Sequence, residues 1–243
     1  MSLLSVSSLE IRYGADRAVH DLSFEIAPGA AVCLLGPNGA GKTSTLLAAS
    51  GLLRPQAGAV TVDGVSAARR DARWFIEHGV VLVPEGARNF AELTVLENLE
   101  LPARALGRQH LKTVLDEVFD LFPVLAERRS QHAGLLSGGE QKMLALGRGL
   151  MTGPRVMCID EPALGLAPVV IARILRSLEE LLRRDLGLLV SEQSLPFVEE
   201  LGGDVLVIER GTCTWRGPAV GTSAVPEVAD ALIGHGTPGT PVT

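Results

Sequence analysis

The stretch that most constrains the fold runs from Gly36 to Thr43 and reads Gly-Pro-Asn-Gly-Ala-Gly-Lys-Thr. It matches the phosphate-loop pattern G-x-x-x-x-G-K-[ST], with the apolar run 31–35 before it and the helix-like run 44–53 after it. In this pattern the glycines turn backbone N–H groups toward a phosphate chain, and the start of the helix adds partial positive charge. Strand, loop and helix in this order predict an α/β fold that binds a nucleoside triphosphate.

Two side chains of the loop carry the expected chemistry. Lys42 is expected to reach the β- and γ-phosphates, and the Thr43 hydroxyl is expected to ligate Mg²⁺.

Bulk composition narrows the class of protein. The 243 residues are 47% hydrophobic, which is enough for a large core, and the net charge is −6. An acidic chain is not typical of a general nucleic-acid binder, which needs a basic face. No apolar run approaches the roughly 18 residues of a membrane span, and the first residues do not resemble a signal peptide. Three widely spaced cysteines predict neither disulfides nor a metal site and fit a reducing cytoplasm.

The first third of the chain is predicted to be rich in strands. Short strands are expected at 9–12, 18–26 and 59–64. Tyr13, between the first two, is the only tyrosine of the chain. It is either a stacking surface for a nucleotide base or an ordinary tyrosine at a strand end.

A mainly helical block is predicted from about 86 to 151. Thr94 and Glu97 form a capping-box pattern ahead of a helix through Leu101, and the apolar spacing at 111–122 predicts an amphipathic helix. Further elements are expected as a long amphipathic helix from Pro168 and as strands at 80–83, 156–159, 187–190, 205–208 and 211–217. The tail 234–243 has the composition of a flexible segment.

The hexapeptide 136–141 reads Leu-Ser-Gly-Gly-Glu-Gln and admits two interpretations. Ser137 and Glu140 form a second capping box, which would make this a plain helix start. Two glycines in a first turn cost about 1 kcal/mol each relative to alanine, so exposed backbone is expected to serve an anion there. The two interpretations are compatible.

Asp160 and Glu161 follow the apolar run 156–159. At a strand end, Asp160 is expected to hold Mg²⁺ and Glu161 to orient or deprotonate an attacking water. An acidic loop without function is the alternative for an isolated pair of this kind.

The phosphate loop, the hexapeptide and the strand ending in Asp160-Glu161 occur in an order that resembles the ATPase subunit of ABC transporters over residues 7–220. The segments 83–86, 93–99, 164–168 and 191–193 are similar to the branch that serves branched-chain amino-acid importers. The resemblance implies a phosphate-loop α/β core with an antiparallel β-subdomain and an inserted helical subdomain at about 86–151. It implies one ABC ATPase domain over 1–233, followed by the tail.

The resemblance also assigns roles to residues. It implies ATP and Mg²⁺ as ligands, a catalytic role for Glu161 and Gln193, and metal contacts from Thr43, Glu85 and Asp160. The residues expected to bind ATP are Tyr13, Gly36, Pro37, Asn38, Gly39, Ala40, Gly41, Lys42, Thr43 and Ser44. Those expected to meet the ATP of a second subunit are Ser137, Gly138, Gly139, Glu140 and Gln141.

Three positions depart from the general family pattern. Gln193 stands in place of a histidine and can donate a hydrogen bond but carries no proton at neutral pH. Ala167 replaces an aspartate, and Glu85 replaces a glutamine. These substitutions leave the rate of hydrolysis open.

The resemblance therefore predicts a dimeric ATPase that energises an importer from the cytoplasmic face of the membrane. Expected partners are a second ATPase, identical or different, membrane permeases and, indirectly, a solute-binding protein, without nucleic acid. Branched-chain amino acids are the expected solute, with urea or related amides as the alternative. The other functions considered are a soluble ABC ATPase outside transport and a slow regulatory partner.

Overall fold

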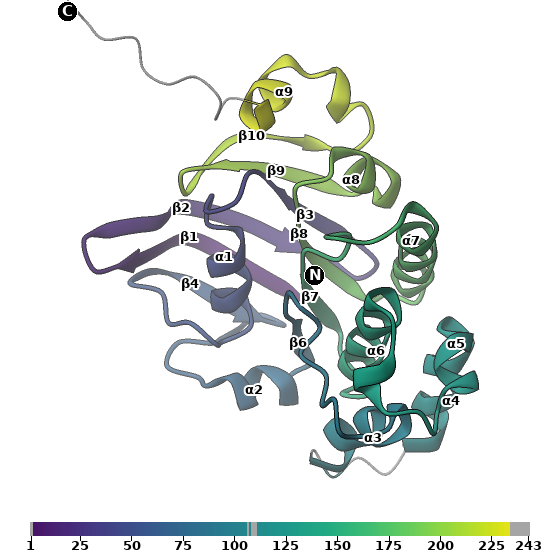
Figure 1. Ribbon diagram of the computed structural model, residues 1–243. Helices are drawn as coiled ribbons and strands as arrows, with labels where there is room; N and C mark the ends of the chain where they lie inside the picture. Colours follow the sequence, from purple (N-terminus) through teal and green to yellow (C-terminus); the bar gives the residue numbers. More distant parts are fainter. Residues whose placement is uncertain (1, 106, 108–110, 234–243) are drawn as a thin grey trace, which may run out of the picture.

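The computed structural model describes residues 2–105, 107 and 111–233. Its strands form two sheets flanked by helices (Figure 1). The strands are β1 (Leu4–Tyr13), β2 (Asp16–Ile26), β3 (Ala31–Leu35), β4 (Ala57–Val62), β5 (Val65–Ser66), β6 (Val80–Val83), β7 (Val156–Asp160), β8 (Gly187–Glu192), β9 (Asp204–Glu209) and β10 (Thr212–Pro218). The helices are α1 (Lys42–Ala49), α2 (Ala72–Glu77), α3 (Val95–Ala105), α4 (Leu111–Leu121), α5 (Pro123–Glu127), α6 (Gly138–Leu150), α7 (Pro168–Arg183), α8 (Leu195–Leu201) and α9 (Pro226–Ile233).

The larger sheet has the strand order β10-β9-β3-β8-β7-β6 and is parallel except for β10, which pairs antiparallel with β9. Every residue of β3, β7 and β8 is buried, as expected for strands covered on both faces. Along β3, Val32 and Leu34 point into one core, and Cys33 and Leu35 point into the other. The carboxyl ends of these strands therefore meet at one edge, where ligands bind in such sheets.

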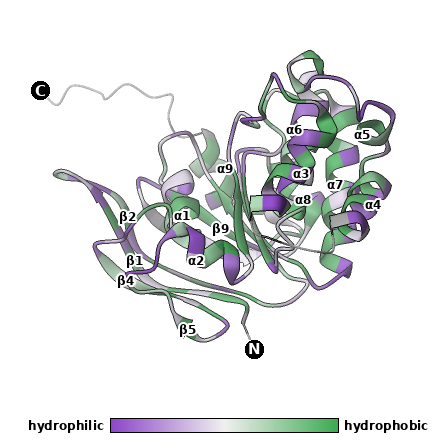
Figure 2. Ribbon diagram, turned by 90° about the horizontal axis from the view of Figure 1, so that it is seen from below, coloured by the Kyte–Doolittle hydropathy of each residue, from purple (hydrophilic) through white to green (hydrophobic). Residues whose placement is uncertain are grey.

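The smaller sheet is antiparallel, with the order β2-β1-β4-β5. It packs over one face of the parallel sheet, with α1 and α2 lying alongside (Figure 2). The core between the sheets joins Leu4 and Phe24 of the small sheet to Leu34 of β3 and Leu46 of α1. This packing fixes α1, and with it the loop that precedes α1, against the parallel sheet.

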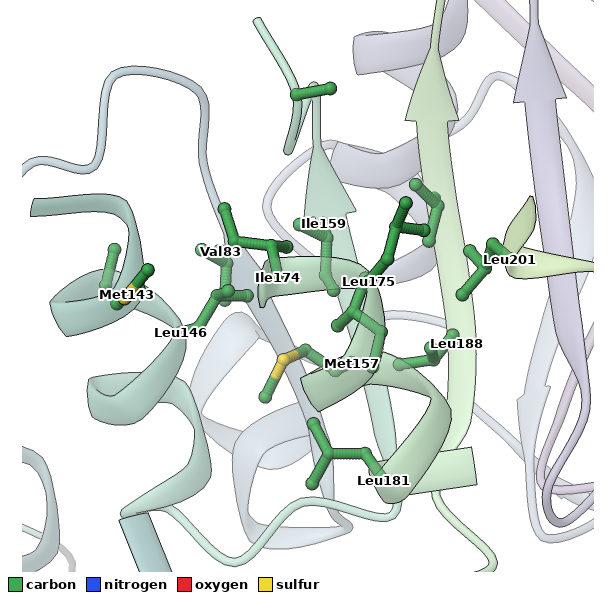
Figure 3. Packing of buried hydrophobic residues seen from close by; sticks show 14 of the residues in the cluster. Val83, Met143, Leu146, Met157, Ile159, Ile174, Leu175, Leu181, Leu188 and Leu201 are labelled. Carbon is green, nitrogen blue, oxygen red and sulfur yellow. The ribbon is translucent and has the colours of Figure 1, made fainter. Parts of the chain in front are cut away.

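Helices α6 and α7 cover the opposite face of the parallel sheet (Figure 3). Leu146 of α6 and Ile174 and Leu175 of α7 lie against Met157 and Ile159 of β7. Each of these side chains is fully buried or nearly so. Complete burial of one such side chain contributes about 1.5–3 kcal/mol.

Several predicted boundaries were wrong in extent. The helix expected at 44–53 begins at Lys42 and ends at Ala49. Gly51, just past the helix end, has a φ of +74°, which is incompatible with a continued α-helix. A Cβ at this position would also lie 2.2 Å from the Phe75 ring, so the site requires glycine. The strands expected at 9–12 and 18–26 are longer, because β1 and β2 pair along most of their length.

The capping box at Thr94 is confirmed. The Thr94 backbone N–H donates to Glu97 Oε2 at 2.8 Å, and the Glu97 backbone N–H donates to Thr94 Oγ1 at 3.2 Å. Helix α3 continues past the expected end at Leu101 to Ala105, with Pro102 inside it. Helices α2, α5, α8 and α9 were not among the predicted elements.

The prediction of an α/β fold is confirmed, with an antiparallel sheet beside the parallel one and helices inserted between β6 and β7. Among the described residues, no helix is both long enough and apolar enough to cross a membrane. The division into a core and a helical subdomain at about 86–151 stays a prediction. The tail 234–243 lies outside the described residues.

Candidate active site

The phosphate loop lies at the carboxyl edge of the parallel sheet, where it joins β3 to α1. Two of its glycines are required by close backbone approach. A Cβ on Gly36 would lie 2.2 Å from the Ile208 carbonyl oxygen, and one on Gly41 would lie 2.3 Å from that of Ala18. Gly41 also has a φ of +107°, a conformation that side chains disfavour. The loop is thus pressed against β9 and β2 and keeps its backbone close to the helix start.

Lys42 folds back over the loop that precedes it. Its Nζ donates to the carbonyl oxygens of Gly36 at 2.7 Å and Pro37 at 3.0 Å. It also lies 3.5 Å from Glu161 Oε1, and both side chains are almost entirely buried. Burial lowers the pKa of Lys42, while the nearby Glu161 carboxylate opposes that shift. A buried cation above a bare loop is suited to receive phosphate oxygens.

Thr43 and Asp160 come from different elements and meet at this edge. Thr43 Oγ1 donates to Asp160 Oδ1 at 3.2 Å, and Ser191 Oγ of β8 donates to the same oxygen at 2.5 Å. Two adjacent oxygens that bind Mg²⁺ at about 2.1 Å in an octahedron are about 3 Å apart. The separation of Thr43 Oγ1 and Asp160 Oδ1 therefore fits two adjacent positions of such a site. Among the described residues, no group of three or more His, Cys, Asp or Glu side chains forms a metal cage.

Glu85, the third expected metal contact, lies on the exposed turn after β6. Its charge acts on Lys142, whose Nζ donates to the Asp160 carbonyl oxygen at 3.1 Å. Within the described part of the chain, no hydrogen bond joins Glu85 to Thr43 or Asp160. Its role as a metal ligand stays a prediction.

Glu161 lies between the phosphate loop and the turn after β8. Gln193 Nε2 donates to both of its carboxylate oxygens, at 2.8 and 3.0 Å, and to Asn38 Oδ1 at 2.9 Å. An amide carries only two N–H bonds, so these three acceptors share two donors. The structure thus brings the two predicted catalytic residues, Glu161 and Gln193, together with Lys42 and Asn38. A carboxylate held in this way beside a phosphate site is placed to orient a water molecule.

Tyr13 and Ser44 lie beside each other at the end of β1 and the start of α1. Their hydroxyl oxygens are 3.3 Å apart, and Tyr13 is 52% exposed. The open ring next to the first turn of α1 suits stacking on a base, and this role stays a prediction.

The hexapeptide forms the start of α6. Ser137 caps the helix, and its capping box with Glu140 is confirmed. The expectation that both glycines of the hexapeptide expose backbone to an anion was wrong for Gly139. A Cβ on Gly139 would lie 2.6 Å from Val170 Cγ1, so this glycine permits α6 to approach α7. A Cβ on Gly138 would meet nothing within 4 Å, so only Gly138 exposes backbone without a packing reason.

The hexapeptide and the phosphate loop remain separate. Ser137 and Gly138 are exposed, and Gln141 bonds through Nε2 to the Leu136 carbonyl oxygen at 3.2 Å. No hydrogen bond in the described part of the chain links this segment to the loop 36–43. The structure therefore completes no site between them within one subunit.

Three buried polar residues at this edge were not predicted as site residues. Lys142 supports the Asp160 backbone, and burial lowers its pKa. Ser191 and Glu192 precede Gln193 and bond to the segment that contains Asp160 and Glu161. A polar pair that ends the otherwise apolar run 188–190 was the sequence signal that marks them.

Comparisons with known proteins identify the family of this chain. Residues 19–164 match the protein family described as ABC transporter. The chain is 35% identical over 232 residues to the high-affinity branched-chain amino acid transport ATP-binding protein BraG of Pseudomonas aeruginosa, covering 96% of this chain and 100% of BraG. It is 31% identical over 198 residues to the lipopolysaccharide export system ATP-binding protein LptB of Haemophilus influenzae, covering 80% of this chain and 82% of LptB.

Solved structures support the fold. The chain superposes with a TM-score of 0.85 on the crystal structure of an ATP-binding cassette of an ABC transporter in its ADP conformation. The superposition covers 97% of this chain and 100% of that one, at 24% identity. The expected arrangement of core, antiparallel sheet and inserted helices is thereby confirmed.

Proposed function

The chain belongs to the ABC transporter family of ATP-binding subunits, and from this membership we propose that it hydrolyses ATP to energise an importer of branched-chain amino acids. The identity to BraG extends over all of that protein and is higher than the identity to LptB. The segments 83–86 and 191–193 also favour the importer branch. Urea and related amides are the alternative solutes.

One observation carries the catalytic part of the proposal. The Glu161 carboxylate is held by Gln193 Nε2 at 2.8 Å and lies 3.5 Å from Lys42 Nζ, at the mouth of the phosphate loop. In the proposed reaction, the backbone of residues 36–43 and Lys42 bind the phosphates while the Tyr13 ring stacks on the adenine. Glu161 orients the attacking water and accepts its proton, and Gln193 donates a hydrogen bond to the γ-phosphate. Thr43 and Asp160, with Glu85 as the third proposed contact, would hold Mg²⁺, which would neutralise phosphate charge.

The test is the Glu161→Gln variant. The amide keeps the shape of the side chain and can still meet Gln193, but it cannot accept a proton at neutral pH. We expect ATP affinity within about twofold of wild type and turnover lower by on the order of 100-fold or more. Steady-state phosphate release and equilibrium binding of ATP measure the two quantities.

Glu200→Gln is the matched control, because it makes the same change on the exposed side of α8. It should hydrolyse ATP at the wild-type rate. Wild-type phosphate release from E161Q would refute the assignment of Glu161.

We propose that the complete site requires two subunits. The exposed Ser137 and Gly138, with the rest of the segment 137–141, would close over the ATP bound to the phosphate loop of a partner. The absence of a bond between these two segments within the described part of one chain supports this arrangement. E161Q should therefore form a dimer in the presence of ATP and Mg²⁺, and size-exclusion chromatography would detect it. A strictly monomeric E161Q at saturating ATP would contradict the arrangement.

The permease is proposed to contact the turn after β6 and the start of α3, on the cytoplasmic face of the membrane. Phe90 is 48% exposed there, and the Arg148 guanidinium carbon lies 4.8 Å from its ring centroid. An exposed aromatic ring supported by a cation offers both apolar and polar contact to a membrane subunit. Leucine uptake by proteoliposomes that contain the permeases, the binding protein and this chain would test the solute. Uptake of urea but not leucine would assign the alternative.

Gln193 and Ala167 favour a second candidate, a slow regulatory ATPase paired with a faster subunit. Ala167 precedes α7 without a side-chain cap, and the amide of Gln193 cannot take up a proton at neutral pH. Phosphate release from the chain alone and with the permease separates the candidates. Failure in both, with normal ATP binding, would favour the regulatory role.

A further inference from the structure

The last two residues of β8 lie beside the segment 160–163 and are hydrogen-bonded to it. Ser191 Oγ donates to Asp160 Oδ1, and it accepts the Glu161 backbone N–H at 3.1 Å. The Glu161 N–H also reaches the Ser191 carbonyl oxygen at 3.1 Å. Gln193 then binds the Glu161 side chain. The end of β8 and the residue that follows it thus hold both the backbone and the side chain of Glu161.

Glu161 needs such support because its backbone is strained. Its φ is +45°, in the left-handed region that residues other than glycine rarely adopt. A non-glycine residue in such a conformation costs about 1–3 kcal/mol and persists only where the surroundings impose it. This backbone conformation points the carboxylate toward Lys42 and Gln193.

Glu192 contributes a second set of bonds, from the opposite face of the strand end. Its Oε1 accepts the Ala163 N–H at 2.7 Å, and its Oε2 accepts the N–H groups of Gln193 at 3.0 Å and Ser194 at 3.3 Å. Its own carbonyl oxygen accepts the Gly36 N–H at 3.3 Å. Glu192 therefore joins the segment after Glu161, the turn that carries Gln193 and the start of the phosphate loop.

Burying the Glu192 carboxylate costs desolvation free energy, which hydrogen bonds to the carboxylate must offset. Glu192 is only 3% exposed, and no salt bridge to it occurs among the described residues. Burial raises its pKa, while the three backbone N–H groups oppose that shift. An apolar residue would fill the same space without the cost of desolvating a charge. In return the carboxylate joins two separate segments, at Ala163 and at Gln193 and Ser194, whereas the bond from Gly36 is made by the backbone and would remain.

We propose that Glu192 is a positioning residue for ATP hydrolysis, which holds Glu161 and Gln193 in register with the phosphate loop. This inference rests on the proposed catalytic role of Glu161. Among the described residues, every hydrogen bond that the Glu192 carboxylate accepts comes from a backbone N–H group, and the carboxylate acts through the two segments that it joins. Ser191 supports the same arrangement from the Asp160 side.

The test is Glu192→Gln, compared with the exposed control Glu200→Gln. The variant keeps one acceptor oxygen but turns an NH₂ group toward backbone N–H donors, so one of the two loops is released. A displacement of about 1 Å of a catalytic group can cost on the order of 100-fold in rate, so we expect kcat to fall by between about 10- and 100-fold. The KM and the dissociation constant for ATP should stay within about twofold of wild type, because the phosphate loop side chains are unchanged.

A double variant shows whether Glu192 acts through Glu161. Once Glu161 is replaced by glutamine, its position no longer matters, so E161Q/E192Q should be no slower than E161Q alone. An unchanged kcat in E192Q would overturn the proposal. So would losses that multiply in the double variant, or a loss of ATP affinity equal to the loss of kcat, since either would show an effect independent of Glu161.

If E192Q does not fold, Glu192→Asp provides the same comparison. The shorter side chain keeps the charge but cannot reach both loops, so its kcat should also fall, and a wild-type kcat would overturn the proposal. The E161Q and E192Q variants also distinguish a failure of this inference from a failure of the proposed function. Normal turnover in E161Q refutes the catalytic assignment itself, whereas slow E161Q with normal E192Q refutes only the role of Glu192.

Discussion

The two glycines at the start of α6 provide a matched pair for separating packing from ligand binding. Gly139→Ala places a methyl group 2.6 Å from Val170 Cγ1, well inside van der Waals contact. Gly138→Ala adds the same methyl group where nothing lies within 4 Å. Neither glycine has a positive φ, so neither substitution strains the backbone.

The two substitutions are expected to change the free energy of unfolding in opposite directions. Forcing an extra methyl into a packed contact costs about 1–3 kcal/mol, and the lower half of that range applies because the side chain of Val170 is only partly buried and can adjust. Gly138→Ala should stabilise the protein by about 0.4–1 kcal/mol, because alanine loses less conformational freedom on folding. In a chain of this size 1 kcal/mol shifts Tm by about 2–4 °C, so the two variants should differ by several degrees.

Activity should show the opposite order. The methyl group of G138A points into open space, where the proposed partner subunit presents its ATP, so phosphate release should fall although the fold is stabilised. G139A should lose stability and keep the exposed backbone of Gly138. Differential scanning calorimetry and steady-state phosphate release measure the two effects.

A third variant checks the cause assigned to Gly139. Replacing Val170 by alanine in the G139A background removes the clashing methyl groups, so the double variant should recover stability relative to G139A. Equal Tm values for G138A and G139A, or a double variant less stable than the sum of the two single changes, would refute the packing explanation.

Two further predictions concern buried titratable groups. Burial raises the pKa of both Cys33 and Cys158 to about 12. An aromatic disulfide reagent at pH 8 should therefore leave these two thiols unmodified in the native protein. Reaction of all three cysteines should require unfolding. Native labelling should be confined to the half-buried Cys213 and vanish in C213S; rapid native labelling of C213S would contradict the burial. Burial lowers the pKa of Lys142 below its unfolded value of 10.5, so the folded state is penalised while Lys142 is charged, and the penalty is relieved as the pH rises through the lowered pKa. The unfolding free energy of wild type relative to K142M should therefore rise with pH in urea titrations between pH 7 and 10.5, and a constant difference would show that Lys142 has an ordinary pKa.

The main fold and the core of the site followed from local patterns in the sequence. The phosphate loop requires a strand before it and a helix after it, and the structure has β3 and α1 in those places. The apolar runs that became β7 and β8 are buried on both faces, which made them recognisable without knowledge of their neighbours. Asp160 and Glu161 could be placed at the end of a strand from the sequence, whereas Gln193 was assigned by the family resemblance. The structure brings all three to one sheet edge because β7 and β8 are parallel and share a carboxyl end.

Features that depend on contacts between distant segments could not be read in this way. The need for glycine at position 51 depends on the Phe75 ring, and the role of Gly139 depends on Val170, 31 residues further along the chain. The left-handed backbone at Glu161 and the three-way bonding of Glu192 arise only when β7, β8 and the phosphate loop lie side by side. Sequence alone determined which residues have the chemistry to bind and hydrolyse a nucleotide, because that information is local. Tertiary structure decided which other residues hold these nucleotide-binding and catalytic residues in position, because a buried hydrogen bond depends on segments that meet only after folding.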